Sequence, residues 1–208
     1  MASGSRQRLI VGISGASGVI YGIRLLEALR ALPVESHLVM SRSAEITAAH
    51  ETDLKIREIH ALADVVHPAG DIAAPIASGS YRTLGMVVAP CSIRSMSEIA
   101  TGVTSSLLTR AADVVLKERR PLVLMLRETP LHSGHLRNLL QLSEMGATIA
   151  PPVPAFYAKP KSVQDIVDQS VGRVLDLFGL DSPLIVGRWG EDGEPAKARG
   201  KTARRKKA

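Results

Sequence analysis

The stretch V-V-L-K-E-R-R-P-L-V-L-M-L-R-E-T-P, residues 114–130, decides the fold of this chain. Its apolar segment L-V-L-M-L, at 122–126, follows a proline and ends abruptly at the adjacent charges Arg127 and Glu128. So short and so apolar a run is typical of a strand buried on both faces, as in a parallel sheet. Ligands of open α/β sheets bind outside the carboxyl ends of the strands, where an arginine suits a phosphate. Arg127 and Glu128 are therefore candidate site residues or, alternatively, a structural ion pair at a strand end.

The rest of the chain alternates between strand patterns and helix patterns. Strands are expected at residues 8–14, 36–41, 84–90, 122–126 and 147–150. Helices are expected at residues 19–32, 44–51, 54–63, 107–119, 132–145 and 162–178, with a further one starting near residue 95. This alternation predicts a single α/β domain with a parallel, doubly wound sheet flanked by helices.

The positive charge of the chain is concentrated at its C-terminal end. The net charge is +6, but residues 197–208 hold seven Lys and Arg residues and no acidic one, so that 19 basic and 20 acidic residues remain elsewhere. We therefore expect a flexible N-terminus at 1–7, a domain at 8–186 and a basic, disordered tail at 187–208. The domain itself does not have the charge of a nucleic-acid-binding module.

Cysteine usage and hydropathy indicate a cytoplasmic protein. Cys91 is the only cysteine, which excludes an intrachain disulfide and a cysteine metal cluster and suits a reducing compartment. No apolar stretch approaches the length of a membrane span, and the N-terminal residues lack the apolar core of a signal peptide. We expect a cytoplasmic chain that does not contact membranes.

Small polar residues follow three of the expected strands. The first strand runs into G-I-S-G-A-S-G at residues 12–18, the second ends at Ser41, and the strand at 84–90 is followed by C-S-I-R-S at 91–95. Glycines allow the backbone to approach a phosphate, and the N-terminus of a following helix offers free N–H groups. The pattern is neither G-x-G-x-x-G nor a P-loop. Three such ends at one edge of a sheet favour a phosphate-bearing nucleotide, and flavin mononucleotide (FMN) suits the mixture of hydroxyls and aliphatic side chains.

These segments, together with L-L-T-R-A-A-D-V-V-L-K-E-R-R-P at 107–121, R-E-T-P-L-H at 127–132 and P-P-V-P-A-F-Y at 151–157, resemble the UbiX-type flavin prenyltransferases. The resemblance spans residues 8–180 and implies a flavodoxin-like Rossmann domain, assembled as a homododecamer with sites at subunit interfaces. It also implies that the dimethylallyl group of dimethylallyl phosphate is joined to reduced FMN at N5 and C6, without a metal. The product, prenylated FMN, would serve a partner UbiD-type decarboxylase.

The same resemblance assigns roles to individual residues. It implies FMN contacts by Gly15, Ala16, Ser17, Ser41, Ser92, Ile93, Arg94, Ser95 and Arg127. It implies dimethylallyl phosphate contacts by Lys117, Arg127, Glu128, Tyr157 and Arg173. Catalytic roles are implied for Glu128, Glu51, Ser17 and Lys117: cations would stabilise the leaving phosphate, and Glu128 would protonate it.

Other features of the sequence leave alternatives open. His132 and His135 lie three apart in an expected helix but lack a third ligand at metal spacing, so a structural role and no metal site are expected. Cys91 has no evident activating base and is expected to pack in the interior. A flavin-dependent cysteine-type decarboxylase would share the fold, and a non-catalytic FMN carrier would not need Lys117, Glu128, Tyr157 and Arg173.

Overall fold

The protein's structure is a computed structural model that describes residues 6–182 and residue 184. Within these residues the strands form one six-stranded, wholly parallel sheet in the order β3-β2-β1-β4-β5-β6. The strands are β1 (Gln7–Ile13), β2 (Val34–Met40), β3 (Val65–His67), β4 (Gly85–Cys91), β5 (Leu122–Leu126) and β6 (Thr148–Ile149). The predicted α/β fold with a parallel, doubly wound sheet is confirmed.

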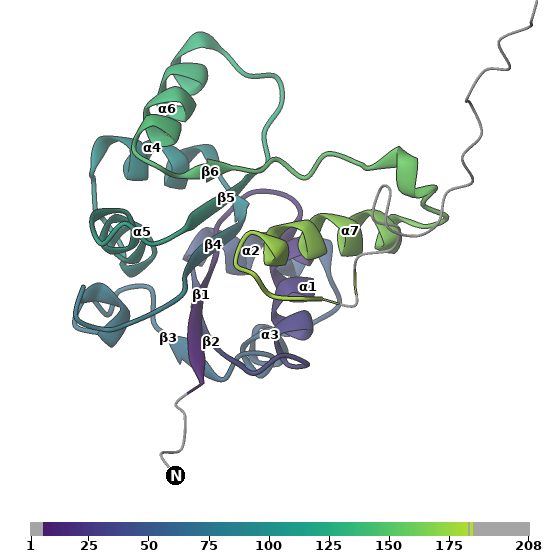
Figure 1. Cartoon of the computed structure of the whole chain (residues 1–208), viewed down its shortest axis with the longest axis horizontal. Coiled ribbons are helices and arrows are strands. Elements are labelled where there is room, and N and C mark those ends of the chain that lie inside the picture. The colour runs from purple at the N-terminus through teal and green to yellow at the C-terminus, as the bar shows by residue number, and fades with distance from the viewer. Residues whose placement is uncertain (1–5, 183, 185–208) are drawn as a thin grey trace, which may run out of the picture.

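Two layers of helices bury the two faces of the sheet (Figure 1). One layer contains α1 (Val19–Leu29), α2 (Arg42–Glu51), α3 (Ile56–His60) and α7 (Val163–Asp176). The other contains α4 (Ile93–Thr101), α5 (Leu107–Lys117) and α6 (Ser133–Glu144), and short 3₁₀ turns lie at Pro75–Ala77 and Phe156–Ala158. Neighbouring strand residues alternate between the layers, as Val87 packs toward α1 and Val88 toward α5. All five residues of β5 are buried, which explains its continuous apolar run.

The direction of winding changes between β1 and β4. From β1 the chain passes through α1 to β2 and then to β3 on one side, whereas β4, β5 and β6 follow on the other side. Close packing at this boundary requires a glycine in α1, because a Cβ at Gly22 would lie 2.3 Å from the carbonyl oxygen of Ala89 in β4. Such a reversal leaves a crevice at the carboxyl ends of the central strands, where ligands of this fold class bind.

The structure differs from the sequence-based expectation in several boundaries. The sequence pattern did not reveal β3, because this strand has three residues and lies at the sheet edge, with too few positions to show a periodicity. Helix α4 begins at Ile93, two residues earlier than expected, because Ser92 caps it. The described chain enters β1 at Gln7, whereas residues 1–5 and the predicted tail at 187–208 lie outside the described residues. Among the described helices, none is both long and apolar enough to span a membrane.

Candidate active site

A cavity of about 600 Å³ opens at the carboxyl edge of the sheet, between segments that follow β1, β2, β4 and β5. Its walls include all the residues expected to contact the flavin: Gly15, Ala16, Ser17, Ser41, Ser92, Ile93, Arg94, Ser95 and Arg127. Residues that had not been singled out complete the wall: Arg42, Ser43, Ala69, Gly70, Glu98, Ser105 and Ser106. Glu128 also lines it. The volume is that of a pocket for a cofactor-sized ligand.

Three helices begin at this cavity, and a serine caps each of them. Ser41 accepts a hydrogen bond from Ala44 N at 3.1 Å at the start of α2, and Ser92 accepts one from Ser95 N at 3.3 Å at the start of α4. Ser106 caps α5 in a capping box with Thr109. The positive ends of the three helix dipoles therefore surround one cavity, which favours an anionic group such as a phosphate.

The loop after β1 approaches the start of α2 closely. A Cβ at Gly15 would lie 2.4 Å from Cβ of Ser43, and Gly18 has φ 99°, in the left-handed region. A larger residue at either position would push the loop away from the cavity or strain its backbone. The glycines of this turn thus allow the tight packing of a loop that lines the cavity.

Ser14 is a buried residue that supports the cavity from behind, and the sequence had not singled it out. Its side chain is fully buried at the end of β1, where Oγ donates to Pro90 O at 2.8 Å and accepts from Ser92 N at 2.7 Å. This hydroxyl joins the end of β1 to the loop after β4, and Ser92 in that loop lines the cavity. The signal was present in the sequence: a hydroxyl ends an otherwise apolar buried strand, R-L-I-V-G-I-S.

Glu51 lies beside the cavity and holds the start of α1. Its Oε2 accepts hydrogen bonds from the backbone N–H groups of Gly18 at 2.8 Å and Val19 at 3.0 Å. Burial would raise the pKa of this carboxyl, but hydrogen bonds from Ser17, Gly18 and Val19 and the charge of Arg127 outweigh it, so the pKa lies below its usual value. Glu51 is therefore ionised at neutral pH. Its carboxylate accepts hydrogen bonds from the expected flavin loop and is attracted by the positive charge of Arg127.

Charged side chains line the mouth of the cavity. The backbone N–H of Arg127 donates to Cys91 O at 3.1 Å, which joins the ends of β5 and β4, and Glu128 Oε1 accepts from Thr129 N at 3.0 Å. Arg94 is 76% exposed and pairs with Glu98, whose Oε1 is 2.8 Å from Arg94 Nε. Both Arg127 and Glu128 are exposed to solvent, so their side chains are accessible to a ligand.

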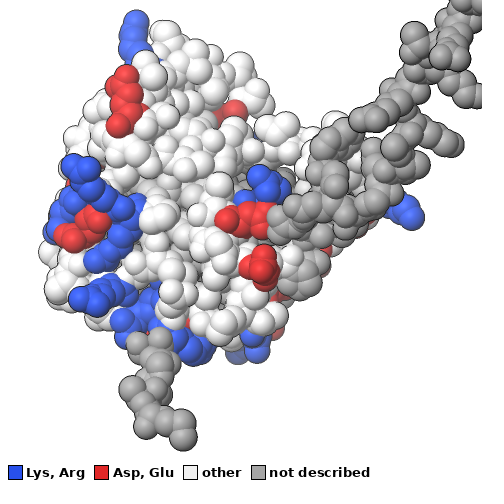
Figure 2. Space-filling model, viewed as in Figure 1, with Lys and Arg blue, Asp and Glu red and all other residues white. Residues whose placement is uncertain are grey.

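Three residues expected to bind the second substrate lie away from this cavity within one chain. Lys117 ends α5, whose start lines the cavity, so the two are about 16 Å apart along the helix. Lys117 instead borders a different cavity of about 800 Å³ with Arg119 and Arg120, and its Nζ is 2.5 Å from Glu118 Oε1. Figure 2 shows basic side chains grouped over this part of the molecule, near α5. The structure of one chain does not bring Lys117 to Arg127.

Tyr157 and Arg173 lie together on the α7 side of the molecule. Tyr157 is half exposed, and its hydroxyl is 3.3 Å from Gln169 Nε2, which donates to it from α7. Arg173 pairs with Asp176 at 2.6 Å and borders a cavity of about 230 Å³ that also includes Pro152. A single chain thus distributes the expected substrate residues over three surface regions.

The histidines and the cysteine expected to be structural have structural positions. His132 caps α6 by accepting from Gly134 N at 3.0 Å, and its ring packs on His135 with centroids 3.6 Å apart. Cys91 is fully buried, and burial raises the pKa of its thiol to about 12. No group of three or more His, Cys, Asp or Glu residues with metal-binding geometry is found among the residues that the structure describes.

The fold and the cavity define a class: a flavodoxin-like α/β protein with a site for a phosphate-bearing nucleotide. Residues 2–175 match the family model described as Flavoprotein. The chain is 60% identical over 185 residues to the flavin prenyltransferase UbiX of Escherichia coli (strain K12), which covers 88% of this chain and 98% of that protein. The flavin prenyltransferase UbiX of Thauera aromatica is 57% identical over 194 residues, 92% of this chain and all of that protein. The chain therefore belongs to the flavoprotein family and, within it, to the UbiX-type flavin prenyltransferases.

Solved structures agree with this assignment. A structure of AnUbiX (PadA1) in complex with FMN and dimethylallyl pyrophosphate matches with a TM-score of 0.87 and 53% identity, over 88% of this chain and 97% of that one. A dodecameric FMN-dependent UbiX-like decarboxylase from Escherichia coli O157:H7 matches with a TM-score of 0.86 and 52% identity, over 88% and 99%. The cysteine decarboxylase SpaF, at 20% identity and a TM-score of 0.58, shares the fold alone. The prediction of a flavin prenyltransferase is confirmed over that of a cysteine-type decarboxylase or a carrier.

Proposed function

We propose that this chain transfers the dimethylallyl group of dimethylallyl phosphate to reduced FMN, forming bonds at N5 and C6 and releasing inorganic phosphate. The observation that carries the proposal is the cavity at which three capped helix N-termini meet, with Arg127 and Glu128 at its mouth. The helix N-termini suit the binding of a phosphate group, and the charged side chains at the mouth suit a reaction that releases phosphate.

FMN fits the residues of the cavity. Its phosphate would be held by N–H groups and hydroxyls of the loop Ser92–Ser95, and its ring system would lie against the loop Gly15–Ser17 and Arg127. Ser41 would contribute a further hydroxyl. When bound, reduced FMN supplies the nucleophilic positions N5 and C6. Glu51, held at the start of α1, would orient Ser17 and so the groups around N5.

Dimethylallyl phosphate would lie at the mouth of the cavity. Arg127 and Glu128 come from the same chain as the flavin loops, whereas Lys117, Tyr157 and Arg173 lie on other surfaces. We propose that these three act in the cavities of neighbouring subunits of a homododecamer, as the family resemblance implies. A site closed by neighbouring chains would also exclude water from a reactive allylic cation.

The chemistry follows from the charges of these groups. Ionisation of an allylic phosphate develops negative charge on the leaving oxygens, which Lys117, Arg127 and Arg173 would stabilise together with the Tyr157 hydroxyl. Glu128 would donate a proton to the phosphate that leaves as N5 bonds to the allylic carbon, and the hydrogen displaced from N5 would restore the acid. The phosphate would then protonate the remaining double bond, C6 would attack the resulting tertiary cation, and the phosphate would accept the proton lost from C6. No metal is needed in this scheme, because side-chain cations neutralise the phosphate.

The product defines the remaining partners. Prenylated FMN is a cofactor rather than an end product, so we propose that it passes to a UbiD-type decarboxylase. We further propose that the reaction takes place in the cytoplasm, since a single buried cysteine suits a reducing compartment. The basic segment at 187–208 lies outside the described residues and has no role in this proposal.

Mass spectrometry of the flavin tests the proposal. After anaerobic incubation with reduced FMN and dimethylallyl phosphate, the wild-type protein is expected to yield a flavin larger by one five-carbon unit. Glu128→Gln should lose or slow this conversion, because the amide cannot donate the proton. Glu27→Gln removes an equal charge from the far end of α1 and should react like the wild type. Bound but unmodified FMN in all three proteins would contradict the proposal, and conversion by Glu128→Gln at the wild-type rate would exclude Glu128 as the acid.

A further inference from the structure

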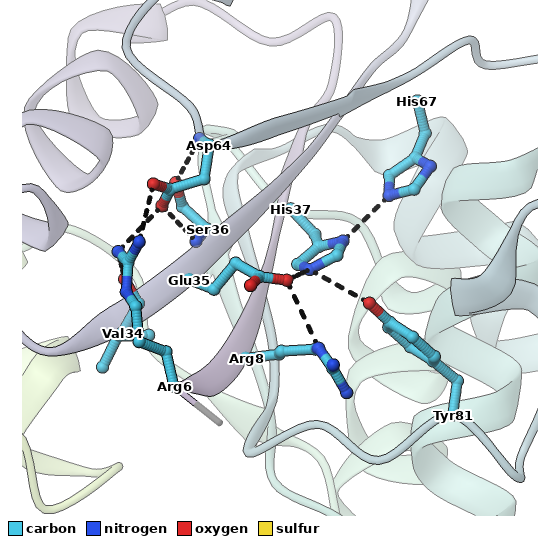
Figure 3. A network of polar contacts seen from close by, with 9 residues as sticks. All are labelled: Arg6, Arg8, Val34, Glu35, Ser36, His37, Asp64, His67 and Tyr81. Carbon is cyan, nitrogen blue, oxygen red and sulfur yellow. Dashed lines mark hydrogen bonds and ion pairs between the residues drawn. The ribbon is translucent and has the colours of Figure 1, made fainter. Parts of the chain in front are cut away.

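A partly buried polar cluster spans β1, β2 and β3 on the side of the sheet that faces α5, and the proposed mechanism does not use it (Figure 3). We call it the histidine cluster: Arg8, Glu35, His37, His67 and Tyr81. His37 on β2 is 2% exposed and His67 at the end of β3 is 8% exposed. His37 Nδ1 is 3.0 Å from His67 Nε2, and the rings stack with centroids 5.3 Å apart.

The hydrogen bond between the two imidazole rings survives when one ring is protonated but not when both are. Glu35 Oε1 lies 2.8 Å from His37 Nε2, so this nitrogen carries a hydrogen and donates it to the carboxylate. A neutral His37 then accepts from His67 at Nδ1, and a charged His37 donates to His67 Nε2 instead. If both imidazoles were charged, two N–H groups would face each other across 3.0 Å and the hydrogen bond would be lost.

The groups around His67 oppose a positive charge on its ring. Glu35 directly contacts His37, while Arg8 donates to Glu35 at 3.3 Å and lies 4.5 Å from the centroid of the Tyr81 ring. The Tyr81 hydroxyl is 3.4 Å from His37 Nε2. Burial and the neighbouring His37 lower the pKa of His67, against a smaller opposing effect of Asp71. Beyond these, Arg120 donates to the backbone carbonyls of Gly79 and Tyr81.

His67 is directly connected to the wall of the flavin pocket. The chain runs from His67 through Pro68 to Ala69 and Gly70, and the last two residues line the cavity. Ala69 O accepts a hydrogen bond from Leu107 N at 2.8 Å, at the start of α5. A shift of His67 would therefore move two parts of the cavity wall, Ala69–Gly70 and the first turn of α5.

We propose that the His37–His67 pair is a positioning element of the flavin pocket. While the two rings share one hydrogen, their hydrogen bond holds the wall at Ala69 and Gly70 in place. When both rings are protonated, this bond is lost and the wall becomes free to move. This inference rests on the proposed function, because it takes the cavity to be the site of FMN. It adds a dependence of flavin binding on pH that arises in the protein, outside the reacting groups.

The test compares FMN affinity at about pH 7.5 and about pH 5.5, on either side of the ordinary histidine pKa. His67→Gln keeps an N–H that can donate to His37 Nδ1 but does not titrate, and His60→Gln on α3 is the matched control. The phosphate of FMN itself titrates near pH 6, so the result is the difference between variants rather than the wild-type slope alone. We expect the wild type and His60→Gln to lose about tenfold more affinity at the lower pH than His67→Gln, which corresponds to about 1.4 kcal/mol of binding free energy.

Hydrogen–deuterium exchange gives a second readout that needs no flavin. Amides of segment 68–82, compared with those of α6 and corrected for intrinsic rates, should exchange faster at the lower pH in the wild type and not in His67→Gln. An equal pH response of FMN affinity in wild type and His67→Gln would overturn the inference, as would unchanged exchange of 68–82. If wild type fails to bind FMN at about pH 7.5, the proposed function fails, and the exchange comparison still decides whether the pair controls this wall. The wild-type exchange also decides the matter if His67→Gln does not fold.

Discussion

Replacing Ser14 with alanine removes the hydroxyl that joins the ends of β1 and β4 beneath the flavin pocket. The change deletes the bond from Oγ to Pro90 O at 2.8 Å and the bond from Ser92 N to Oγ at 2.7 Å. Pro90 O keeps a partner, because Ser14 N also donates to it at 3.2 Å. The net loss is therefore one partly buried N–H, that of Ser92, which is left without an acceptor.

The magnitude follows from that single donor. An unsatisfied buried donor costs about 1–3 kcal/mol, and partial exposure of Ser92 places the expected loss of unfolding free energy at about 1–2 kcal/mol. Ser92 also caps α4 and lines the cavity, so relaxation of its loop should displace the groups that face the FMN phosphate. We expect FMN affinity to weaken about five- to tenfold, since about 1.4 kcal/mol corresponds to a factor of ten.

Ser36→Ala is the matched control. Ser36 is also buried, and its hydroxyl also makes two hydrogen bonds, to the backbone N–H of Asp64 at 2.9 Å and to its carboxylate at 3.0 Å, but far from the cavity near the start of β2. Both variants should lose similar stability in chemical denaturation, and only Ser14→Ala should lose affinity in a fluorescence titration with FMN. Wild-type affinity in Ser14→Ala, or an equal loss in Ser36→Ala, would refute the reasoning.

Two further predictions concern single ionisable groups. The folded-state pKa of Glu51 lies below its usual value, so its ionised form stabilises the fold above about pH 4.5 and this contribution disappears as the pH falls through the folded pKa. Glu51→Gln should therefore lower the unfolding free energy near neutral pH by about 0.5–1 kcal/mol, allowing for solvent exposure, and flatten the acid limb of a stability–pH curve; an unchanged curve would argue against an anion at the start of α1. Cys91 is buried with its pKa raised to about 12, so iodoacetamide at mildly alkaline pH should label it in denaturant and leave the native protein unlabelled; rapid native labelling would contradict this burial.

Local patterns in the sequence determined the class of fold and the position of the main site. The strand at 122–126 is confirmed residue for residue, because five consecutive apolar residues between a proline and two charges have few alternatives. The polar turns after β1, β2 and β4 could be assigned to one cavity, because the carboxyl ends of parallel strands meet at one edge of a sheet. The individual residues expected around FMN came from the family resemblance.

The tertiary structure decided what depends on pairs of residues far apart in the chain. The edge strand β3 exists only because it pairs with β2. The hydrogen bonds between Ser14 and Ser92 and between His37 and His67 join residues about 30 or more positions apart in the sequence. The sequence likewise could not show that Lys117, Tyr157 and Arg173 lie away from the cavity. A motif gives the order of residues along the chain and not the face of the molecule on which each one lies. Periodicity reports the local environment of each residue, whereas these contacts are fixed only when the sheet and its two helical layers pack together.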